Sequence, residues 1–295
     1  MKKVIVIAGL TATGKTSTAV KLAKAIDAEI ISADSVAVYK GLDIGSAKPS
    51  LEEQDGIKHH FIDIQNYKDT YNVALFQEAA RKLIKEIHAK DKHVIIAGGT
   101  GLYIKALLYD YRFEDESKEA YSREESTEVL YKELQNKDKE TAKTIHPNNR
   151  KRILRALESF ELHQKPRSEI THNNKDTQII DADVFFLQGD RQKIYERINK
   201  RVHTMFELGL EKEVKDFYEK DPDIFKYPSF QSIGYREFED YLNNNIDKDT
   251  LIRLIQRNTR RFAKRQITWF KHQQPSVWID IFNEDPIQVI LENIK

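Results

Sequence analysis

The chain has 295 residues, of which 40% are hydrophobic and 32% are charged, with a formal net charge of +1 at pH 7. This composition is typical of a globular protein of one or two domains with a sizeable core. The absence of cysteine excludes disulfides, thiolate catalysis and cysteine-based zinc sites. No apolar stretch approaches the roughly 20 residues that span a bilayer. No signal-peptide pattern precedes the first apolar run, so we expect a cytoplasmic protein without membrane contact.

A phosphate-binding motif follows the apolar run Val4 to Ala8. Residues 9–16 match the pattern G-x-x-x-x-G-K-[ST] between a predicted strand and a predicted helix. The glycines let the loop curl so that backbone N–H groups face a phosphate, Lys15 reaches an outer phosphate, and the Thr16 hydroxyl can bind Mg²⁺. The predicted phosphate-binding residues are Gly9, Thr11, Ala12, Thr13, Gly14, Lys15 and Thr16. The loop alone does not say whether the phosphates belong to ATP.

Short apolar runs alternate with helical patterns in the first third of the chain. The predicted strands are Val4 to Ala8, Glu29 to Ser32, His60 to Ile64 and His93 to Ala97. Helices are predicted to end near Ile26, to run from Val73 to Lys90, and to follow Gly101. Alternation of this kind is typical of a parallel sheet with crossover helices.

Residues 112–180 differ in character, because they are highly charged and poor in strand patterns. Helical patterns cover Glu124 to Gln135 and Arg150 to His163, and the strand-like run Val184 to Gln188 then returns to the core. A compact helical insertion explains this better than a long structureless loop. We therefore expect a core of residues 1–111 and 181–295, with a helical insertion domain of residues 112–180.

The last third is predicted to be mostly helical. Asp190 caps a helix that runs to about Leu208 and stops at Gly209. Further elements are a loop from Tyr227 to Gly234, a helix from Ile246 to Lys271, a strand from Val277 to Asp280 and a helix from Pro286 to Ile294.

The helix that ends at Lys271 carries many basic residues and no acidic one after Leu251. At helical spacing one face holds Leu251, Ile255, Phe262 and Trp269, and another holds Arg253, Arg257, Arg260 and Lys264. An ordinary solvated face would interleave Glu with the cations, so the pattern favours contact with phosphate or RNA.

Polar residues follow two predicted strands at the carboxyl edge of the sheet, where open α/β folds bind ligands. Asp34, beside Ser35, can accept a proton from a nucleophile near the phosphate loop, although a helix cap is the alternative. In the turn 98–101, Thr100 favours a substrate contact, and a tight glycine turn is equally supported.

Two further pairs of residues are candidates for a metal site and for a diphosphate site, respectively. His59 and His60 do not indicate a metal site, because adjacent strand residues point to opposite faces. Arg197 and Arg201 lie four apart on one predicted helix and can clamp a diphosphate, although such surface arginines are also common.

Taken together, these segments resemble the tRNA dimethylallyltransferase family, and the match runs nearly from end to end. The matching segments are 9–16, 31–35, 38–45, 47–49, 59–60, 63–64, 98–103, 145–148 with Arg152 and Arg155, 233–235, 260–261 and 263–269. The resemblance implies a P-loop, nucleotide-kinase-like α/β core with a parallel sheet and a mostly helical insertion domain. The implied reaction transfers a dimethylallyl group from dimethylallyl diphosphate to N6 of the adenosine just 3′ of the anticodon.

In this family the phosphate loop holds the diphosphate of the donor. The resemblance assigns Asp34 as general base and Thr100 as a polar contact, with Mg²⁺ as cofactor, the tRNA anticodon stem-loop as partner and a monomer as the expected unit. The implied tRNA contacts are Asp34, Ser35, Val36, Ala37, Lys151, Arg152, Ile153, Leu154, Arg155, Gln231, Ser232, Ile233, Gly234, Tyr235 and Arg236. Arg197 and Arg201 join the predicted diphosphate site because of their spacing.

The chain departs from the family at two places. Leu10 stands where the family usually has proline, and residues 112–126 match poorly, so Arg123 is left out of the predicted tRNA contacts.

Two other functions compete with this prediction. An ATP-dependent small-molecule kinase would explain the phosphate loop and Asp34, with the insertion as a lid, but not the acid-free basic helix. A non-catalytic RNA-binding protein with a relic nucleotide site would predict substitutions at Lys15, Thr16 or Asp34, and none is present.

Overall fold

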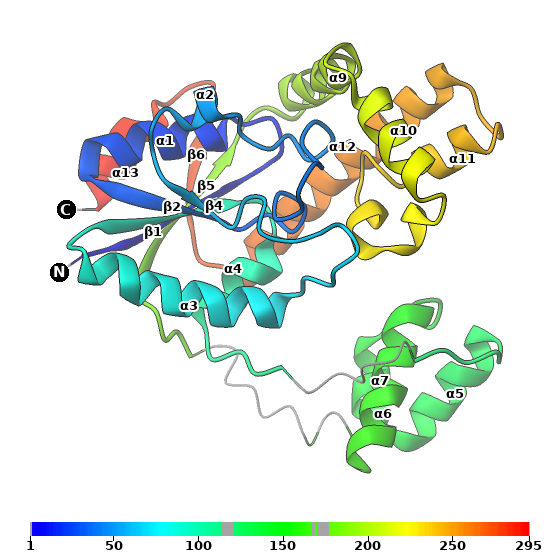
Figure 1. Ribbon diagram of the computed structural model, residues 1–295. Coiled ribbons are helices and arrows are strands. Elements are labelled where there is room, and N and C mark those ends of the chain that lie inside the picture. The colour runs from blue at the N-terminus through cyan, green and yellow to red at the C-terminus, as the bar shows by residue number, and fades with distance from the viewer. Residues whose placement is uncertain (1, 114–120, 167–168, 170–176, 295) are drawn as a thin grey trace. The chain divides into compact units, whose positions relative to one another are not determined.

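The structure is a computed structural model that describes residues 2–113, 121–166, 169 and 177–294 (Figure 1). The chain divides into two compact units. Unit 1 contains Met1–Leu108 and Ile179–Lys295, and unit 2 contains Tyr109–Gln178. Among the described residues, no helix is both long and apolar enough to cross a membrane.

A parallel sheet with the strand order β3-β2-β4-β1-β5-β6 forms the centre of unit 1. The strands are β1 Val4–Gly9, β2 Ala28–Ser32, β3 His59–His60, β4 His93–Gly98, β5 Ala182–Gln188 and β6 Val277–Asp280. Because β1 lies between β4 and β5, the phosphate loop leaves the middle of the sheet at its carboxyl edge. Ligands of open parallel sheets bind at this edge.

Helices cover both faces of this sheet, and others extend beyond it (Figure 1). They are α1 Lys15–Ile26, α2 Leu51–Gln54, α3 Val73–Ala89, α4 Gly101–Leu108, α9 Arg191–Glu207, α10 Leu210–Lys220, α11 Phe238–Leu242, α12 Lys248–Gln273 and α13 Pro286–Asn293, with 3₁₀ turns at Ile224–Lys226 and Pro228–Gln231. In Figure 1, α1 and α13 lie on one face and α3 and α4 on the other. Ile5, Leu22, Phe185 and Ile290 are fully buried in one cluster between the sheet and the α1 side. The burial of these apolar side chains stabilises the sheet and hence the loops at its edge.

The structure differs from the predicted elements at β3 and after α9. Strand β3 ends at His60, because Phe61 adopts a left-handed backbone with φ of 63°. The prediction of a strand from His60 to Ile64 is therefore wrong. Gly209 follows α9 as expected, but with φ of 101° it also caps α10, which the patterns do not predict.

The buried face of α12 also differs from the prediction. Its fully buried residues are Leu251, Ile255, Ala263, Gln266 and Phe270. Phe262 and Trp269, which lie on the predicted apolar face, are partly buried. The buried stripe turns around the helix because α12 packs first on α9, where Gln256 donates to the Asn199 carbonyl, and further along on the turn before α4.

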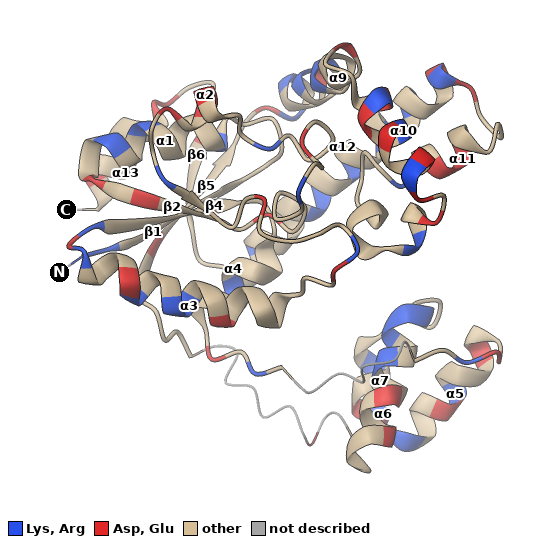
Figure 2. Cartoon of the chain, viewed as in Figure 1, with Lys and Arg blue, Asp and Glu red and all other residues tan. Residues whose placement is uncertain are grey.

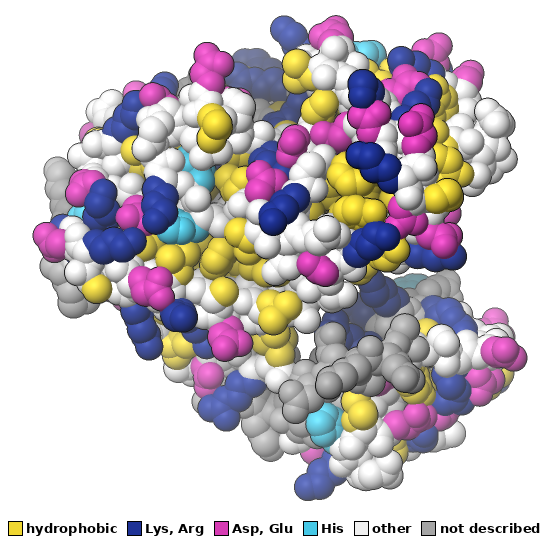
Figure 3. All heavy atoms as spheres, in the orientation of Figure 1, with side chains coloured by type: hydrophobic (Ala, Val, Ile, Leu, Met, Phe, Trp, Pro, Cys, Tyr) yellow, Lys and Arg dark blue, Asp and Glu magenta, His cyan; other side chains and the backbone are white. Residues whose placement is uncertain are grey.

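The basic residues of α12 fall into two groups. Arg253, Arg257 and Lys264 are exposed, whereas Arg260 donates to Asn199 Oδ1 of α9 at 2.5 Å. On the face shown in Figure 3, Lys and Arg are interspersed with Asp and Glu, in keeping with the net charge of +1.

The described part of unit 2 contains three short helices with a core of their own. They are α5 Thr127–Lys137, α6 Lys139–Thr144 and α7 Arg150–His163, of which the patterns do not predict α6. Leu130, Leu134, Ile153 and Leu157 are fully buried among them. Arg123 forms ion pairs with Glu125, Glu133 and Glu161, so it ties the chain before α5 to this unit.

Candidate functional site

The phosphate loop joins β1 to α1 in a form that can bind an anion. Gly14, directly before α1, has φ of 81°, a left-handed conformation that glycine adopts without strain. Inside the loop, the Leu10 carbonyl accepts hydrogen bonds from Thr13 Oγ1 at 2.7 Å and from Lys15 Nζ at 2.6 Å. None of the described carboxylates forms an ion pair with Lys15, so its ammonium is available to a phosphate.

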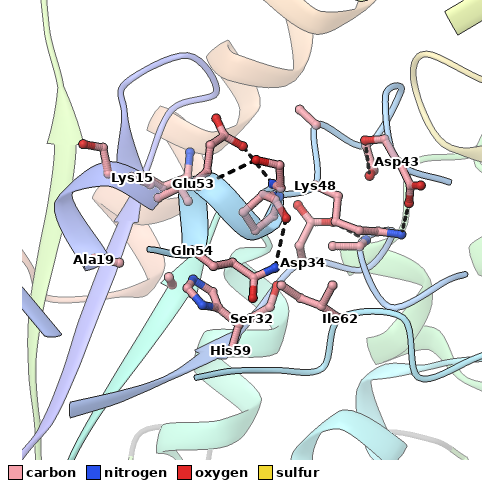
Figure 4. A pocket seen from close by; sticks show the side chains of 18 of the residues that line it. Lys15, Ala19, Ser32, Asp34, Asp43, Lys48, Glu53, Gln54, His59 and Ile62 are labelled. Carbon is pink, nitrogen blue, oxygen red and sulfur yellow. Dashed lines mark hydrogen bonds and ion pairs between the residues drawn. The ribbon is translucent and has the colours of Figure 1, made fainter. Parts of the chain in front are cut away.

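A cavity of about 920 Å³ lies over this loop (Figure 4). Three segments bring chemically active side chains to it: Lys15 from α1, Asp34 from the end of β2 and Arg201 from α9. The predicted site residues in its lining are Thr11, Ala12, Gly14, Lys15, Thr16, Asp34, Ala37 and Arg201. The cavity therefore joins the predicted phosphate loop to the predicted general base.

Lys15 and Arg201 repel each other in a desolvated environment. Burial and then the charge of Arg201 lower the pKa of Lys15 to about 7, although Asp34 acts in the opposite direction. Burial also lowers the pKa of Arg201, while the nearby carboxylates of Glu53 and Asp34 favour its charged form. An anion bound beside both cations would relieve this repulsion, so the cavity favours a negatively charged ligand.

The two oxygens of Asp34 have different surroundings. Oδ1 accepts hydrogen bonds from the N–H of Val36 at 2.8 Å and of Ala37 at 3.2 Å. Oδ2 accepts none from the described residues. One oxygen is therefore held by the backbone while the other can take a proton, as a general base requires.

Four of the predicted catalytic and diphosphate-binding residues do not line the cavity. Gly9 ends β1, and Thr13 is buried with its hydroxyl on the Leu10 carbonyl. Thr100 lies in the turn before α4, where its carbonyl accepts from the Tyr103 N–H at 3.0 Å. The guanidinium of Arg197 lies 4.6 Å from the centroid of the Phe282 ring. Of the two predicted arginines on α9, the structure brings only Arg201 to the phosphate loop.

Residues 43–48 are held by contacts that the sequence patterns do not reveal. Glu213 of α10 accepts from the Ile44 N–H at 2.8 Å and from the Tyr235 hydroxyl at 2.7 Å. Lys48 pairs with Asp43 and Asp63 at 2.5 Å each. These contacts fix one wall of the cavity, which includes Lys48 and Asp43 (Figure 4). Lys48 belongs to a segment of the family resemblance, whereas no motif includes Glu213.

The predicted tRNA contacts at 231–236 are only partly accessible. Gln231 and Arg236 are exposed, Ser232 and Ile233 are partly exposed, and Gly234 is buried. Tyr235 is 0% exposed, because its ring packs against Gly45 and its hydroxyl bonds Glu213. We therefore correct the predicted role of Tyr235, since its side chain supports residues 43–46 and does not face a ligand.

The predicted contacts in unit 2 lie at the start of α7. Lys151, Arg152 and Arg155 are exposed, and Figure 2 shows the basic residues of this helix. Ile153 is 0% exposed in the core of unit 2, and Leu154 packs partly on that core. The contacts predicted for Ile153 and Leu154 are corrected accordingly, which leaves the three basic side chains as the accessible part of this set.

Oxygen atoms at the phosphate loop suit a hard cation. The described residues contain no cluster of three or more His, Cys, Asp or Glu that could hold a metal by itself. Thr16 and Asp34 line the same cavity, and a hydroxyl with a carboxylate fits Mg²⁺, which usually keeps several waters and binds substrate phosphates. His60 is engaged elsewhere, because its Nε2 lies 2.6 Å from Glu29 Oε2.

The parallel sheet, the glycine-rich loop behind β1 and the cavity at the carboxyl edge define a phosphate-binding α/β protein of the P-loop type. A sequence model of the family described as IPP transferase matches residues 37–273, which is most of the chain. The chain therefore belongs to the IPP transferase family. This membership confirms the predicted resemblance and fold class, and it does not favour the kinase alternative.

Known relatives match the chain over its whole length. It is 41% identical to a tRNA dimethylallyltransferase of Bacillus mycoides (strain KBAB4), covering 100% of this chain and 95% of that protein. A solved tRNA delta(2)-isopentenylpyrophosphate transferase from Staphylococcus epidermidis is 38% identical with a TM-score of 0.74, covering 100% of this chain and 98% of that one. A eukaryotic dimethylallyltransferase acting on tRNA is 28% identical with a TM-score of 0.84, covering 99% and 78%.

Proposed function

We propose that this protein transfers the dimethylallyl group of dimethylallyl diphosphate to N6 of the adenosine just 3′ of a tRNA anticodon, with release of diphosphate. The convergence of Lys15, Arg201 and Asp34 on one cavity is the main support. The relatives named as tRNA dimethylallyltransferases support tRNA as the substrate. A monomer suffices for this reaction, because these three side chains come from a single chain.

The cations and the loop amides act on the leaving group. During transfer the bond between C1 of the allyl group and a diphosphate oxygen breaks, and the diphosphate leaves with the electron pair. Lys15 and Arg201 stabilise the negative charge that develops on this oxygen, and the N–H groups of the phosphate loop add to this effect. The allyl group delocalises the positive charge on C1, so cleavage of the C–O bond can precede formation of the new bond.

Asp34 acts on the acceptor. N6 of adenine is a weak nucleophile, because its lone pair is delocalised into the ring. As the N6–C1 bond forms, Asp34 Oδ2 takes a proton from N6 and so avoids a cationic nitrogen. The N–H groups of Val36 and Ala37 hold the other carboxylate oxygen in place during this transfer.

Mg²⁺ is the cation that fits the oxygen atoms of this cavity. Thr16 and a diphosphate would hold it, with Asp34 close enough to line the same space. When bound, it would neutralise part of the charge on the diphosphate.

The acceptor base must leave its stack before it can reach the partly buried carboxylate of Asp34 in the cavity. Bases in a loop pay less for this than bases in a duplex, which suits the anticodon loop. On α7, Lys151, Arg152 and Arg155 are proposed to hold phosphates of the stem-loop. In unit 1 the exposed candidates for tRNA contact are Gln231 and Arg236. The partly exposed candidates are Asp34, Ser35, Val36, Ser232 and Ile233.

One experiment separates transfer from phosphorylation. The protein is incubated with undermodified tRNA, Mg²⁺ and either dimethylallyl diphosphate or ATP, and the tRNA nucleosides are then analysed by mass spectrometry. We expect N6-dimethylallyladenosine with dimethylallyl diphosphate and no new nucleoside with ATP. Absence of the prenylated nucleoside would contradict the proposed function.

A further inference from the structure

The side chain of Gln266 joins two loops at the carboxyl edge of the sheet. Its Oε1 accepts a hydrogen bond from the Thr11 N–H of the phosphate loop at 3.3 Å. Its Nε2 donates to the Gly99 carbonyl, in the turn that carries Thr100, at 3.0 Å. Gln266 belongs to α12, so a single amide connects three segments that are far apart in the sequence.

This amide stands where the pairing of β1 and β4 ends. The two parallel strands pair as far as Ala8 with Gly98. Beyond this point the backbone of one strand enters the phosphate loop and that of the other enters the turn with Thr100. The Gln266 amide accepts from a backbone N–H of the phosphate loop and donates to a backbone carbonyl of the turn. It therefore bridges the two chains beyond the last strand pair, in the way that a peptide group of an intervening strand would.

The fit around the amide is close. Gln266 is 4% exposed, and a Cβ added to Gly99 would lie 2.3 Å from its Nε2. The next nearest atom to this Cβ would be the Gly9 carbonyl oxygen at 3.5 Å, an ordinary contact. Glycine at position 99 is therefore required by Gln266 in particular, and not by its own backbone angles.

We infer that Gln266 is a positioning residue, which sets the spacing between the phosphate loop and the turn that carries Thr100. This inference rests on the proposed transfer reaction, in which the donor binds at the phosphate loop, and Gly98, at the start of that turn, lines the same cavity. Gln266 does not line the cavity, and its contacts are with the backbone of Thr11 and Gly99. Displacement of catalytic groups by about 1 Å can reduce a rate by about 100-fold.

A pair of variants on the same helix tests the inference. Gln266→Met keeps the size of the side chain but loses both hydrogen bonds. Gln256→Met is the matched control, because Gln256 also links α12 to a backbone carbonyl, that of Asn199 in α9, away from the phosphate loop. Each variant is compared with the wild-type protein for pyrophosphate affinity by calorimetry, and for kcat and KM of transfer per titrated active site.

For Gln266→Met we expect weaker pyrophosphate binding, a kcat lower by about 100-fold and an unchanged KM for tRNA. Gln256→Met should match the wild type in all three. A loss that disappears once kcat is expressed per active site would indicate a role in folding only and would overturn the inference. Unchanged pyrophosphate affinity in Gln266→Met would also overturn it. Failure of the wild-type protein to prenylate tRNA would instead refute the proposed function.

A second measurement keeps the test independent of any single variant. Gly99→Ala should reduce kcat in the wild-type background, because the new methyl group displaces the Gln266 amide. In the background of Gln266→Ala the same change should have little further effect, because the obstructing atom is gone. Equal effects of Gly99→Ala in both backgrounds would contradict the inference.

Discussion

At the scale of single residues, a substitution of Asp34 can remove the proposed base and keep the hydrogen bonds that hold the side chain. Asp34→Asn keeps an oxygen that can accept from the N–H of Val36 and Ala37, but it removes the base. We expect it to lower kcat of transfer by a factor between about 100 and about 10,000, the usual contribution of a general base. Single-turnover assays with saturating tRNA would measure the loss.

Binding provides the control for this variant. Asp34→Asn and Asp34→Ala should both bind tRNA largely as the wild-type protein does, by filter binding. Turnover at the wild-type rate in either variant would remove Asp34 from the role of base.

Lys15 should make the binding of diphosphate dependent on pH. Its pKa in the free protein is lowered to about 7 from the model-peptide value of 10.5, chiefly by burial. Bound diphosphate favours the cation and raises this pKa again. Pyrophosphate affinity should therefore be highest below pH 7 and fall by up to about tenfold per pH unit as the pH rises above it.

The matched control for this pH profile is Lys15→Arg, which keeps its charge over the whole range. Calorimetric titrations between about pH 6 and about pH 9 would separate the titration of Lys15 from that of pyrophosphate, because the latter affects both proteins. Identical profiles for the two proteins would show that Lys15 does not titrate in this range.

The same shift has a consequence for stability. Between pH 7 and 10.5 the unfolded chain binds more protons at Lys15 than the folded chain does. The contribution of Lys15 to the free energy of unfolding therefore rises with pH across this window, and its penalty is fully present below pH 7.

At the scale of elements, α9 separates two arginines that share one helical face in sequence. Arg201 lines the cavity beside Lys15, whereas Arg197 lies over the ring of Phe282. Arg201→Met should weaken binding of dimethylallyl diphosphate by between about tenfold and about 100-fold, the usual cost of a hydrogen bond to a charged group. Arg197→Met should leave donor binding unchanged.

Donor binding can be followed by fluorescence competition or calorimetry. Equal losses in the two variants would indicate that both arginines clamp the diphosphate, as their spacing alone suggests. Loss in Arg197→Met only would place the diphosphate away from the cavity.

The parts of the site that could be predicted are local in sequence. Lys15 and Thr16 belong to a short motif, and Asp34 follows a strand whose edge the alternating pattern locates. Glu213 and Gln266 escape prediction because their partners are backbone groups 169 and 255 residues away, respectively. Periodicity also treats Arg197 and Arg201 alike, and only the packing of α9 against the rest of unit 1 distinguishes them.

The fold shows the same division. Strands buried on both faces read as apolar runs, so the sheet could be predicted almost in full, apart from the end of β3. Helix α10 and the turning buried face of α12 could not, because both depend on which neighbour each helix meets. The buried roles of Tyr235 and Ile153 likewise follow from tertiary packing, and no motif carries that information.

At the scale of the whole molecule, the two units have separate cores and separate roles in the proposed reaction. Unit 1 holds the cavity with Lys15 and Asp34, and unit 2 presents basic side chains at the start of α7. A net charge of only +1 leaves no strong general attraction for RNA. Affinity for tRNA should therefore depend on a few local clusters of cations.

Removal of one such cluster tests this division. The triple variant Lys151→Ala, Arg152→Ala and Arg155→Ala should weaken tRNA binding. The slope of log K against log salt concentration should become shallower by roughly two to three, because binding releases fewer counterions when three phosphate contacts are lost. Pyrophosphate affinity should not change, since the cavity in unit 1 is untouched. The matched control removes three exposed lysines elsewhere in unit 2, Lys132, Lys139 and Lys143. An equal change of slope in both triple variants would mean that unit 2 attracts tRNA only through its total charge, and not through α7.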